Sequence, residues 1–224
     1  MEHPLDRPVW SALTTRQAGF AIGDDHALRF DPEVALFAAT ADATPGSLAA
    51  LADLMPATGV VGLVERFDPA LPGGLRVISQ ARCVQMIARR LTVPEPTFDV
   101  RPLGDADATD MLELATLTEP GPFFARTHKL GGFVGVREHG QLVAMAGERL
   151  KAPGFTEVSG VCTRPGWRGR GYAAALLGLV ARRIADRGET PFLHAYADHA
   201  ATIALYERLD FEIRARMTYT IVGR

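Results

Sequence analysis

The chain has 224 residues, which is long for one small domain and short for two full ones. Hydrophobic residues make up 47% and charged residues 22% of the sequence, so the composition excludes a wholly disordered or fibrous protein. The net charge of −2 excludes the strongly basic balance typical of binding to nucleic acid or an anionic membrane. Two cysteines form neither a zinc cluster nor a disulfide framework. Because there is no signal-peptide pattern and no long apolar run, we expect a cytoplasmic protein.

The first 97 residues are interrupted by proline and glycine and contain no chemical motif. Their apolar patterns predict helices over 8–20 and 47–55, and strands over 33–39, 59–65 and 83–89. The segment 93–97 is too rich in proline for a helix or a central strand. We therefore predict two regions, 1–97 and 98–224.

The second region alternates strand and helix patterns. We predict, in chain order, a strand over 98–103, a helix over 106–117, a hairpin of strands over 132–136 and 142–146, a strand over 155–163, a helix over 171–187, a strand over 191–196, a helix over 199–208 and a strand over 211–221. Hairpins combined with a crossover helix indicate a mixed sheet with helices on its faces.

A glycine turn joins the strand over 155–163 to the helix that follows it. Residues 168–173 of this turn read Arg-Gly-Arg-Gly-Tyr-Ala. Closely spaced glycines let backbone N–H groups converge, and the start of a helix adds free donors and the positive end of its dipole. Such a turn is suited to phosphate or pyrophosphate. The alternative is a glycine loop with solvated arginines.

A dinucleotide site is a second alternative for the same turn. Gly169-x-Gly171-x-x-Ala174 fits the dinucleotide fingerprint, and Glu189 follows at about the required spacing. That fingerprint needs the strand to run almost directly into the first glycine, whereas residues 164–168 intervene here. The sequence therefore favours another phosphate-bearing ligand.

Two motifs resemble the GNAT superfamily of acyl-CoA-dependent N-acyltransferases. Residues 168–173 match the phosphate motif of that family, Gln/Arg-x-x-Gly-x-Gly/Ala, at every specified position. The alanine-rich segment 200–211, with Leu-Tyr before a final strand, resembles its second motif. The segment 161–165, Val-Cys-Thr-Arg-Pro, is similar to the branch related to glycine N-acyltransferase, which also carries an N-terminal region.

The resemblance implies a GNAT-like α/β fold over 98–224, with a mixed, mostly antiparallel central sheet and flanking helices. It implies a smaller, reduced GNAT-like α/β half over 1–97. It also implies an acyltransferase that uses acetyl-CoA and no metal, and that acts on a primary amine of a small molecule or amino acid by direct attack in a ternary complex. The expected coenzyme A contacts are the main chain of Val161, Cys162 and Thr163, the turn residues Arg168, Gly169, Arg170, Gly171, Tyr172 and Ala173, and His199, which stands where many members have asparagine.

Acyl transfer to an amine needs a base, because an alkylammonium must lose a proton, and the leaving thiolate benefits from an acid. The resemblance makes Glu157 the expected base; a solvated carboxylate at a strand end is the alternative, and Glu148 is a weaker rival. Tyr206 matches the family tyrosine whose hydroxyl approaches the sulfur, although packing on the sheet would also explain it. We expect the side chains of Cys162 and His194 to belong to the core.

The acceptor site is expected between the first helix and the second strand of this region, where the family shapes its acceptor pocket. Phe123 and Phe124 either form an apolar wall or anchor the loop on the core. Arg126 is the candidate for binding an acceptor carboxylate. His128 either faces the acceptor channel or is an exposed loop residue.

Two other functions stay open at this point. A non-catalytic, regulatory coenzyme A-binding module would keep the glycine turn and lose the base and the acid. A protein lysine or N-terminal acetyltransferase would be favoured by an acidic groove, of which the net charge gives no hint. The expected partner is a small-molecule amine, with no nucleic acid and no membrane, and the chain is expected to be a monomer or a homodimer.

Overall fold

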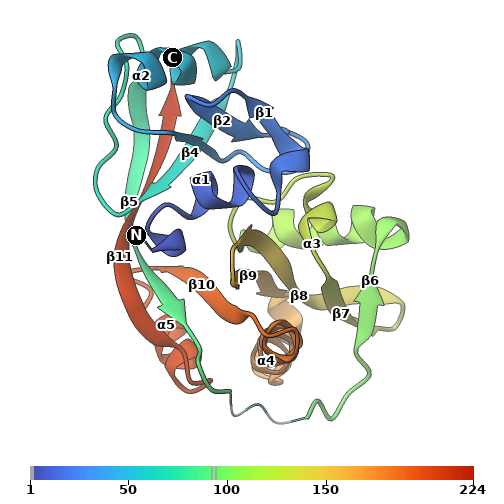
Figure 1. Cartoon of the computed structure of the whole chain (residues 1–224). Helices are drawn as coiled ribbons and strands as arrows, with labels where there is room; N and C mark the ends of the chain where they lie inside the picture. Colours follow the sequence, from blue (N-terminus) through green and yellow to red (C-terminus); the bar gives the residue numbers. More distant parts are fainter. Residues whose placement is uncertain (1–2, 92, 94) are drawn as a thin grey trace.

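An eight-stranded sheet forms the centre of the computed structural model, which describes residues 3–91, 93 and 95–224 (Figure 1). The strands lie in the order β4-β11-β5-β10-β9-β8-β7-β6, with β9–β10 parallel and the other neighbours antiparallel. Their bounds are Val60–Glu65 for β4, Arg76–Ile87 for β5, Arg101–Leu103 for β6, Phe133–Glu138 for β7, Gln141–Ala152 for β8, Phe155–Thr163 for β9, Thr190–Tyr196 for β10 and Glu212–Gly223 for β11. The predicted mixed, mostly antiparallel α/β fold is confirmed.

Helices cover both faces of the sheet. On one face, α4 (Tyr172–Asp186) buries Leu176 and Ile184 in a core cluster that includes Val84 of β5. On the other face, α1 (Pro8–Leu13) shares a cluster with Cys83, the neighbour of Val84 in β5, because successive strand residues point to opposite faces. Helix α3 (Ala108–Thr118) packs on β8 and β9, and α5 (Ala200–Glu207) precedes β11. Residues of α4 and α5 line the site described below.

The region before the central sheet is built from short elements. A second sheet contains β1 (Ala21–Gly23), β2 (Ala27–Phe30) and β3 (Ala38–Thr40), and α2 (Pro45–Leu54) follows it. The predicted helix over 47–55 is therefore confirmed. The predicted helix over 8–20 is wrong after Leu13, because the hydroxyls of Thr14 and Thr15 bond back to carbonyls of the preceding turn and a short 3-10 turn follows. The predicted strand over 33–39 is formed as β3 only at its end.

The central sheet is continuous across residue 97. Strands β4 and β5 come from the N-terminal side, and β5 lies between β10 and β11. Cys83 of β5 is opposite Tyr196 on one side and Met217 on the other. Strand β6, the next strand in the chain, lies at the opposite edge of the sheet from β4. Pro94, within the predicted linker over 93–97, lies outside the described residues.

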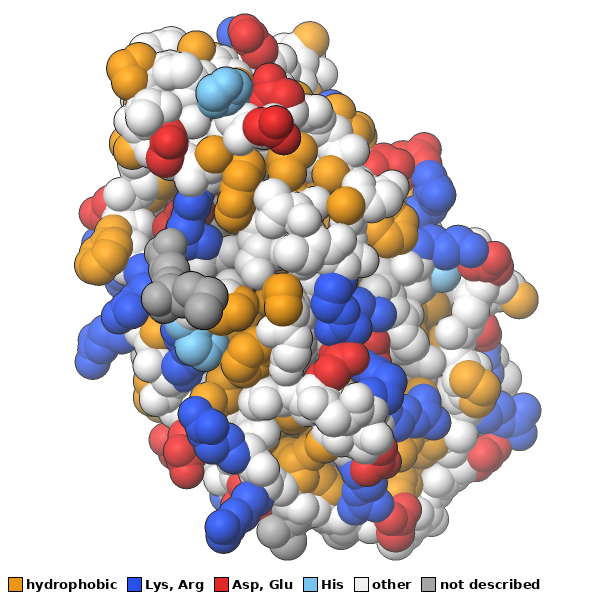
Figure 2. All heavy atoms as spheres, viewed as in Figure 1, with side chains coloured by type: hydrophobic (Ala, Val, Ile, Leu, Met, Phe, Trp, Pro, Cys, Tyr) orange, Lys and Arg blue, Asp and Glu red, His pale blue; other side chains and the backbone are white. Residues whose placement is uncertain are grey.

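The surface carries charges of both signs. In the view of Figure 2, Lys and Arg side chains occupy the middle and lower parts of the face, with Asp and Glu among them. This face shows no continuous acidic groove of the kind that a lysine-rich peptide would favour. Among the residues that the structure describes, no helix is both long enough and apolar enough to cross a membrane.

Candidate active site

The neighbouring strands β9 and β10 are paired only where they begin. Residues 155–157 of β9 are in register with residues 190–192 of β10, and from there the two strands separate. Farther along, β9 pairs with β8 and β10 pairs with β5, so residues 158–163 present an unpaired backbone edge toward the opening. Gly160 has a φ of 63° beside a register shift between β8 and β9, which bends β9 at the opening. The opening therefore offers backbone donors and acceptors to an extended ligand.

The glycine turn after β9 lies at one end of this opening. Gly169 and Gly171 adopt φ values of 79° and 82°, which few side chains tolerate. The backbone N–H groups of residues 169–174 donate no hydrogen bond to another described residue. They surround a cavity of about 370 Å³ at the start of α4. The turn thus has the free donors that an anion-binding helix start requires.

Charged and aromatic side chains complete the wall of this first cavity. The guanidinium of Arg170 lies over the ring of Trp167, 4.4 Å from its centre, and Nε of Arg168 donates to the carbonyl of Thr163 at 3.2 Å. The hydroxyl of Tyr172 donates to Glu138 at 2.9 Å. The predicted coenzyme A contacts that line this cavity are Val161, Cys162, Thr163, Arg168, Gly169, Arg170, Gly171, Tyr172 and Ala173.

A second cavity of about 220 Å³ adjoins the first along the opening. The two cavities share Pro120, Val161, Thr202 and Tyr206 in their walls. His199, the remaining predicted coenzyme A contact, lines the second cavity. Side chains of the N-terminal region also line it, namely Phe37, Val64 and Cys83. The N-terminal region therefore supplies part of the wall of the site.

Tyr206, on α5, stands where the two cavities meet. Burial raises the pKa of its phenol to about 12. No described residue forms a hydrogen bond with its hydroxyl, whereas the ring packs against the main core cluster. The phenol is therefore protonated at neutral pH, and its proton is free to be donated to a ligand.

Glu157 is fully buried at the point where β9 and β10 separate. Its carboxylate accepts two hydrogen bonds from Arg149, at 2.8 and 2.9 Å, and lies 2.7 Å from Nδ1 of His194. Burial alone would raise the pKa of Glu157, but the charge and hydrogen bonds of Arg149 and His194 more than offset it and hold the pKa well below its usual range. Glu157 is therefore an ion-paired carboxylate behind the second cavity, and it does not line the cavity wall.

The surroundings of His194 assign its tautomer. Nε2 of Gln85 donates to the carbonyl of Leu5 at 3.0 Å, and its Oε1 accepts from Arg214 at 2.8 Å, so the orientation of the Gln85 amide is settled. The same amide nitrogen lies 3.1 Å from Nε2 of His194, which must then accept. The ring proton consequently sits on Nδ1 and is donated to Glu157. His194, which lines the second cavity, is thus held by both of its ring nitrogens.

The residues predicted to bind the acceptor lie elsewhere. Phe123 packs edge-on against Phe133 in a core cluster, with ring centres 5.7 Å apart. Phe124 has its backbone N–H bonded to Thr127, and Arg126 forms exposed ion pairs with Asp31 and Glu33. His128 is buried and bonded to Asp105 at 2.9 Å. None of these four residues lines either cavity, so their placement gives no support to an acceptor-binding role.

The two cysteines and the rival carboxylate have structural surroundings. Burial raises the pKa of Cys83 and of Cys162 to about 11, so neither thiol is an activated nucleophile. Glu148 is 4% exposed and forms ion pairs with Lys151 and Arg187. It lines neither cavity.

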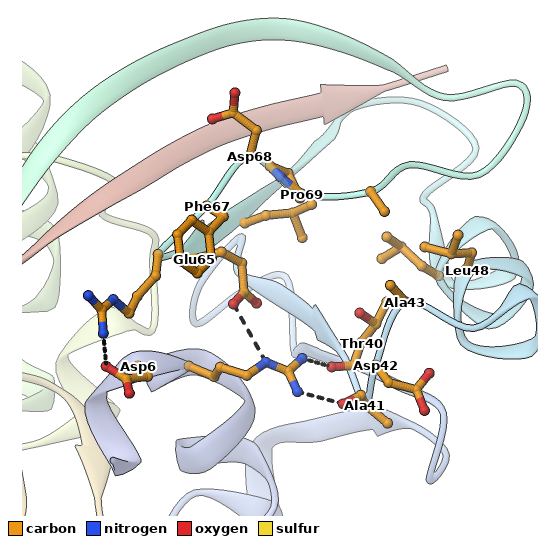
Figure 3. Close-up of a pocket in the computed structure, with 15 residues that line it drawn as sticks. Asp6, Thr40, Ala41, Asp42, Ala43, Leu48, Glu65, Phe67, Asp68 and Pro69 are labelled. Atoms are coloured by element: carbon orange, nitrogen blue, oxygen red, sulfur yellow. Dashed lines mark hydrogen bonds and ion pairs between the residues drawn. The ribbon is translucent and has the colours of Figure 1, made fainter. Parts of the chain in front are cut away.

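A third cavity, of about 460 Å³, lies in the N-terminal region and shares no lining residue with the other two. Figure 3 shows Asp6, Glu65 and Asp68 around it, together with the backbone at Thr40 and Ala41. Arg7 lines the cavity, donates to both of those carbonyls and lies 3.6 Å from Glu65, and Arg66 pairs with Asp6 at 3.4 Å. With both of its arginines engaged in this way, the cavity offers no counterpart to the glycine turn.

Solved structures and a family model are similar to this chain, one of the structures over its whole length. A family model described as FR47-like protein matches residues 133–221. A solved structure from Novosphingobium aromaticivorans, assigned to the GNAT family as an acetyltransferase, is 46% identical, covers 100% of this chain and 99% of its own, and superposes with a TM-score of 0.91. A GCN5-related N-acetyltransferase from Kribbella flavida is 22% identical, with coverage of 94% and 93% and a TM-score of 0.66, and so supports the fold. No curated protein matches significantly.

Fold, open strand pair and glycine turn together define a GNAT-type acyltransferase scaffold. With a relative 46% identical over its full length, the chain belongs to the GNAT family of acetyltransferases. The narrower resemblance to the glycine N-acyltransferase branch stays a prediction.

Proposed function

We propose that the protein transfers the acetyl group of acetyl-CoA to a primary amine of a small molecule or amino acid, by direct attack in a ternary complex. The main support for this proposal is the opening between β9 and β10, which connects the free donors of the glycine turn with the second cavity. A pantetheine arm laid along this opening would pair with the backbone of residues 158–163. The pyrophosphate would meet the N–H groups of residues 169–174, and the thioester would reach Tyr206.

The chemistry then needs few groups. The neutral amine attacks the thioester carbonyl, a C–N bond forms, and the C–S bond breaks as the electron pair returns to sulfur. Tyr206 is the proposed donor of a proton to that sulfur, for which its protonated phenol at the junction of the cavities is suited. The raised pKa values of both thiols favour direct transfer over an acyl-cysteine intermediate.

The base role of Glu157 stays a prediction. The contacts of its carboxylate restrict the route by which it could accept a proton. Its carboxylate is occupied by Arg149 and His194, so a proton from the amine would have to arrive through the His194 ring. Nε2 of that ring would first have to leave Gln85. Loss of the proton to water in the open second cavity is the alternative route.

Release of free thiol from acetyl-CoA, measured over a panel of small amines, amino acids and lysine peptides, tests this function. We expect amine-dependent release with small amines or amino acids. Binding of coenzyme A without any amine-dependent release would instead support a regulatory module. A strong preference for peptides over every small amine would support a protein acetyltransferase.

Replacing Tyr206 with phenylalanine should lower kcat by about a hundredfold, the usual size of a lost general acid, because only the hydroxyl is removed. The affinity for coenzyme A should change little, since the ring keeps its packing against the core. Steady-state kinetics combined with calorimetry of coenzyme A binding separates these two effects.

Tyr219→Phe is the matched control, because burial also raises the pKa of this phenol to about 12 and Tyr219 lines the second cavity but not the first. It should leave coenzyme A binding intact and lower kcat far less than Tyr206→Phe. Full activity of Tyr206→Phe would remove Tyr206 as the acid.

A further inference from the structure

We propose that Arg149 binds a carboxylate on the acceptor, which makes the acceptor an amino acid rather than a simple amine. The proposal rests on the proposed function, because it places the acceptor in the second cavity. It names the specificity-determining residue of that cavity and the chemical class that the residue selects.

Glu157 holds only one edge of the Arg149 guanidinium. Nε and Nη2 of Arg149 both donate to Glu157, at 2.8 and 2.9 Å, which is a side-on paired contact. A guanidinium has five N–H donors in one plane, so this contact uses only one edge. The edge formed by Nη1 and the second hydrogen of Nη2 is left over, and it has the spacing that matches a second carboxylate.

The remaining edge of the guanidinium faces the second cavity. Arg149 lines the second cavity, and its Nη1 lies 3.9 Å from the point where a Cβ on Gly121 would stand, at the loop that borders the cavity. No described residue accepts a hydrogen bond from Nη1. The guanidinium carbon lies 4.9 Å from the ring centre of Phe37, so the plane is held from its face as well. Arg149 is therefore a rigid donor pair directed at the ligand space.

The burial and charge of Arg149 also favour a carboxylate as its ligand. Arg149 is mostly buried, with 13% of its side chain exposed, and a ligand that fills the cavity removes the water around Nη1. Donors left without partners in this way oppose binding, whereas a carboxylate satisfies both of them. Glu157 already balances the charge of Arg149, and the neighbouring His194 is neutral in the assigned tautomer. An anionic group of the acceptor is thus accepted by hydrogen bonding rather than by an excess of positive charge.

The size of the second cavity also fits an amino acid. A cavity of about 220 Å³ suits a single amino acid, and Tyr206, where the thioester is proposed to lie, lines the same cavity as Arg149. Phe37, Val64 and Tyr219 give the remaining wall an apolar character. An amino acid can therefore place its carboxylate on Arg149, its amine toward Tyr206 and an apolar side chain between them.

Matched acceptors test this inference. For each active amino acid, kcat/KM is compared with that of its amide, which keeps the amine and the side chain but loses the charge. We expect the acid to be preferred by about ten- to a hundredfold, the usual size of discrimination when a buried donor loses its partner. Arg149→Lys keeps a cation beside Glu157 but loses the second edge, so it should reduce this preference to near one.

Arg137→Lys is the control substitution, because this arginine is ion-paired with Asp107 and Asp110 and lines neither cavity. It should leave the preference unchanged. If Arg126→Ala removed the preference while Arg149→Lys kept it, the assignment to Arg149 would be overturned.

A second measurement needs no variant. In the presence of coenzyme A, an N-acetyl amino acid should raise the melting temperature of the wild-type protein, and the corresponding N-acetyl amide should raise it clearly less. Equal stabilisation by both, or equal kcat/KM for acids and amides, would contradict the inference and leave the proposed transferase function intact. Absence of transfer to every amine would instead contradict the proposed function.

Discussion

A fragment containing residues 98–224 should not fold alone, although both family motifs lie within it. In the structure, β5 separates β10 from β11, and among the described residues β11 pairs only with β4 and β5. Removing residues 1–97 takes away both partners of β11 and leaves unpaired edges on β10 and β11. It also removes Met86 and Ile87, which are buried on opposite faces of the sheet. We expect an insoluble product or one without a cooperative melting transition.

A split protein provides the control. Residues 1–97 and 98–224, co-expressed as separate chains, keep every strand and differ from the intact protein by one peptide bond. They should co-purify and recover the melting transition, because the β5 pairings are restored. A monomeric fragment 98–224 that melts cooperatively and binds coenzyme A would contradict the shared sheet.

Glu157→Gln should destabilise the protein by about 3–5 kcal/mol, the usual effect of removing one partner of a buried ion pair. The substitution keeps the size of the side chain but leaves the buried guanidinium of Arg149 without its counterion. The melting temperature should fall by about 10 °C for a chain of this length. Glu33→Gln is the control, because its ion pair with Arg126 is exposed and should contribute about 1 kcal/mol or less.

The same variant has a predicted pH signature. The folded pKa of Glu157 is depressed, so its contribution to stability is present above the ordinary carboxylate pKa of 4.5 and is lost as the pH falls below it. The wild type should therefore lose more stability than Glu157→Gln between neutral pH and about pH 3. Denaturant unfolding at several pH values measures this difference. Parallel curves for the two proteins would show that the buried pair does not carry the assigned energy.

The glycine turn and its helix could be predicted from the sequence because their signals are local. Closely spaced glycines at 169 and 171, followed by an apolar helical face, specify the turn and the start of α4 wherever the rest of the chain lies. Tyr206 could be predicted in the same way, because its motif lies on one short helix, α5. The strands and helices of residues 98–224 follow their predicted ranges closely, apart from two strands. The strand predicted over 98–103 forms only as β6 (Arg101–Leu103), and β8 runs on to Ala152.

The second cavity could not be predicted, because its walls come from distant parts of the chain. Cys83 reaches the cavity through the pairing of β5 with β10 and β11, and Phe37 through its bridge to Gly62 of β4, and no local pattern encodes either arrangement. The charged residues near the end of β8 stand out in a mostly buried strand, but Glu148 and Lys151 share that pattern with Arg149. The acceptor-binding role predicted for Arg126 rested only on its place in a loop. In the structure, Arg126 instead forms ion pairs with Asp31 and Glu33, which come from a distant part of the sequence.

Calorimetric titration with coenzyme A tests the central claim most directly, using Gly171→Ala and Gly188→Ala as a matched pair. Both glycines have a positive φ, and a Cβ at either meets no protein atom within 4 Å, so both variants carry similar backbone strain. Only Gly171 lies among the free N–H groups of the turn. We expect one coenzyme A per chain, with affinity lowered about tenfold or more by Gly171→Ala and unchanged by Gly188→Ala, because backbone strain at position 171 turns the neighbouring N–H groups away from the anion. No binding by the wild type, or equal binding by both variants, would contradict it.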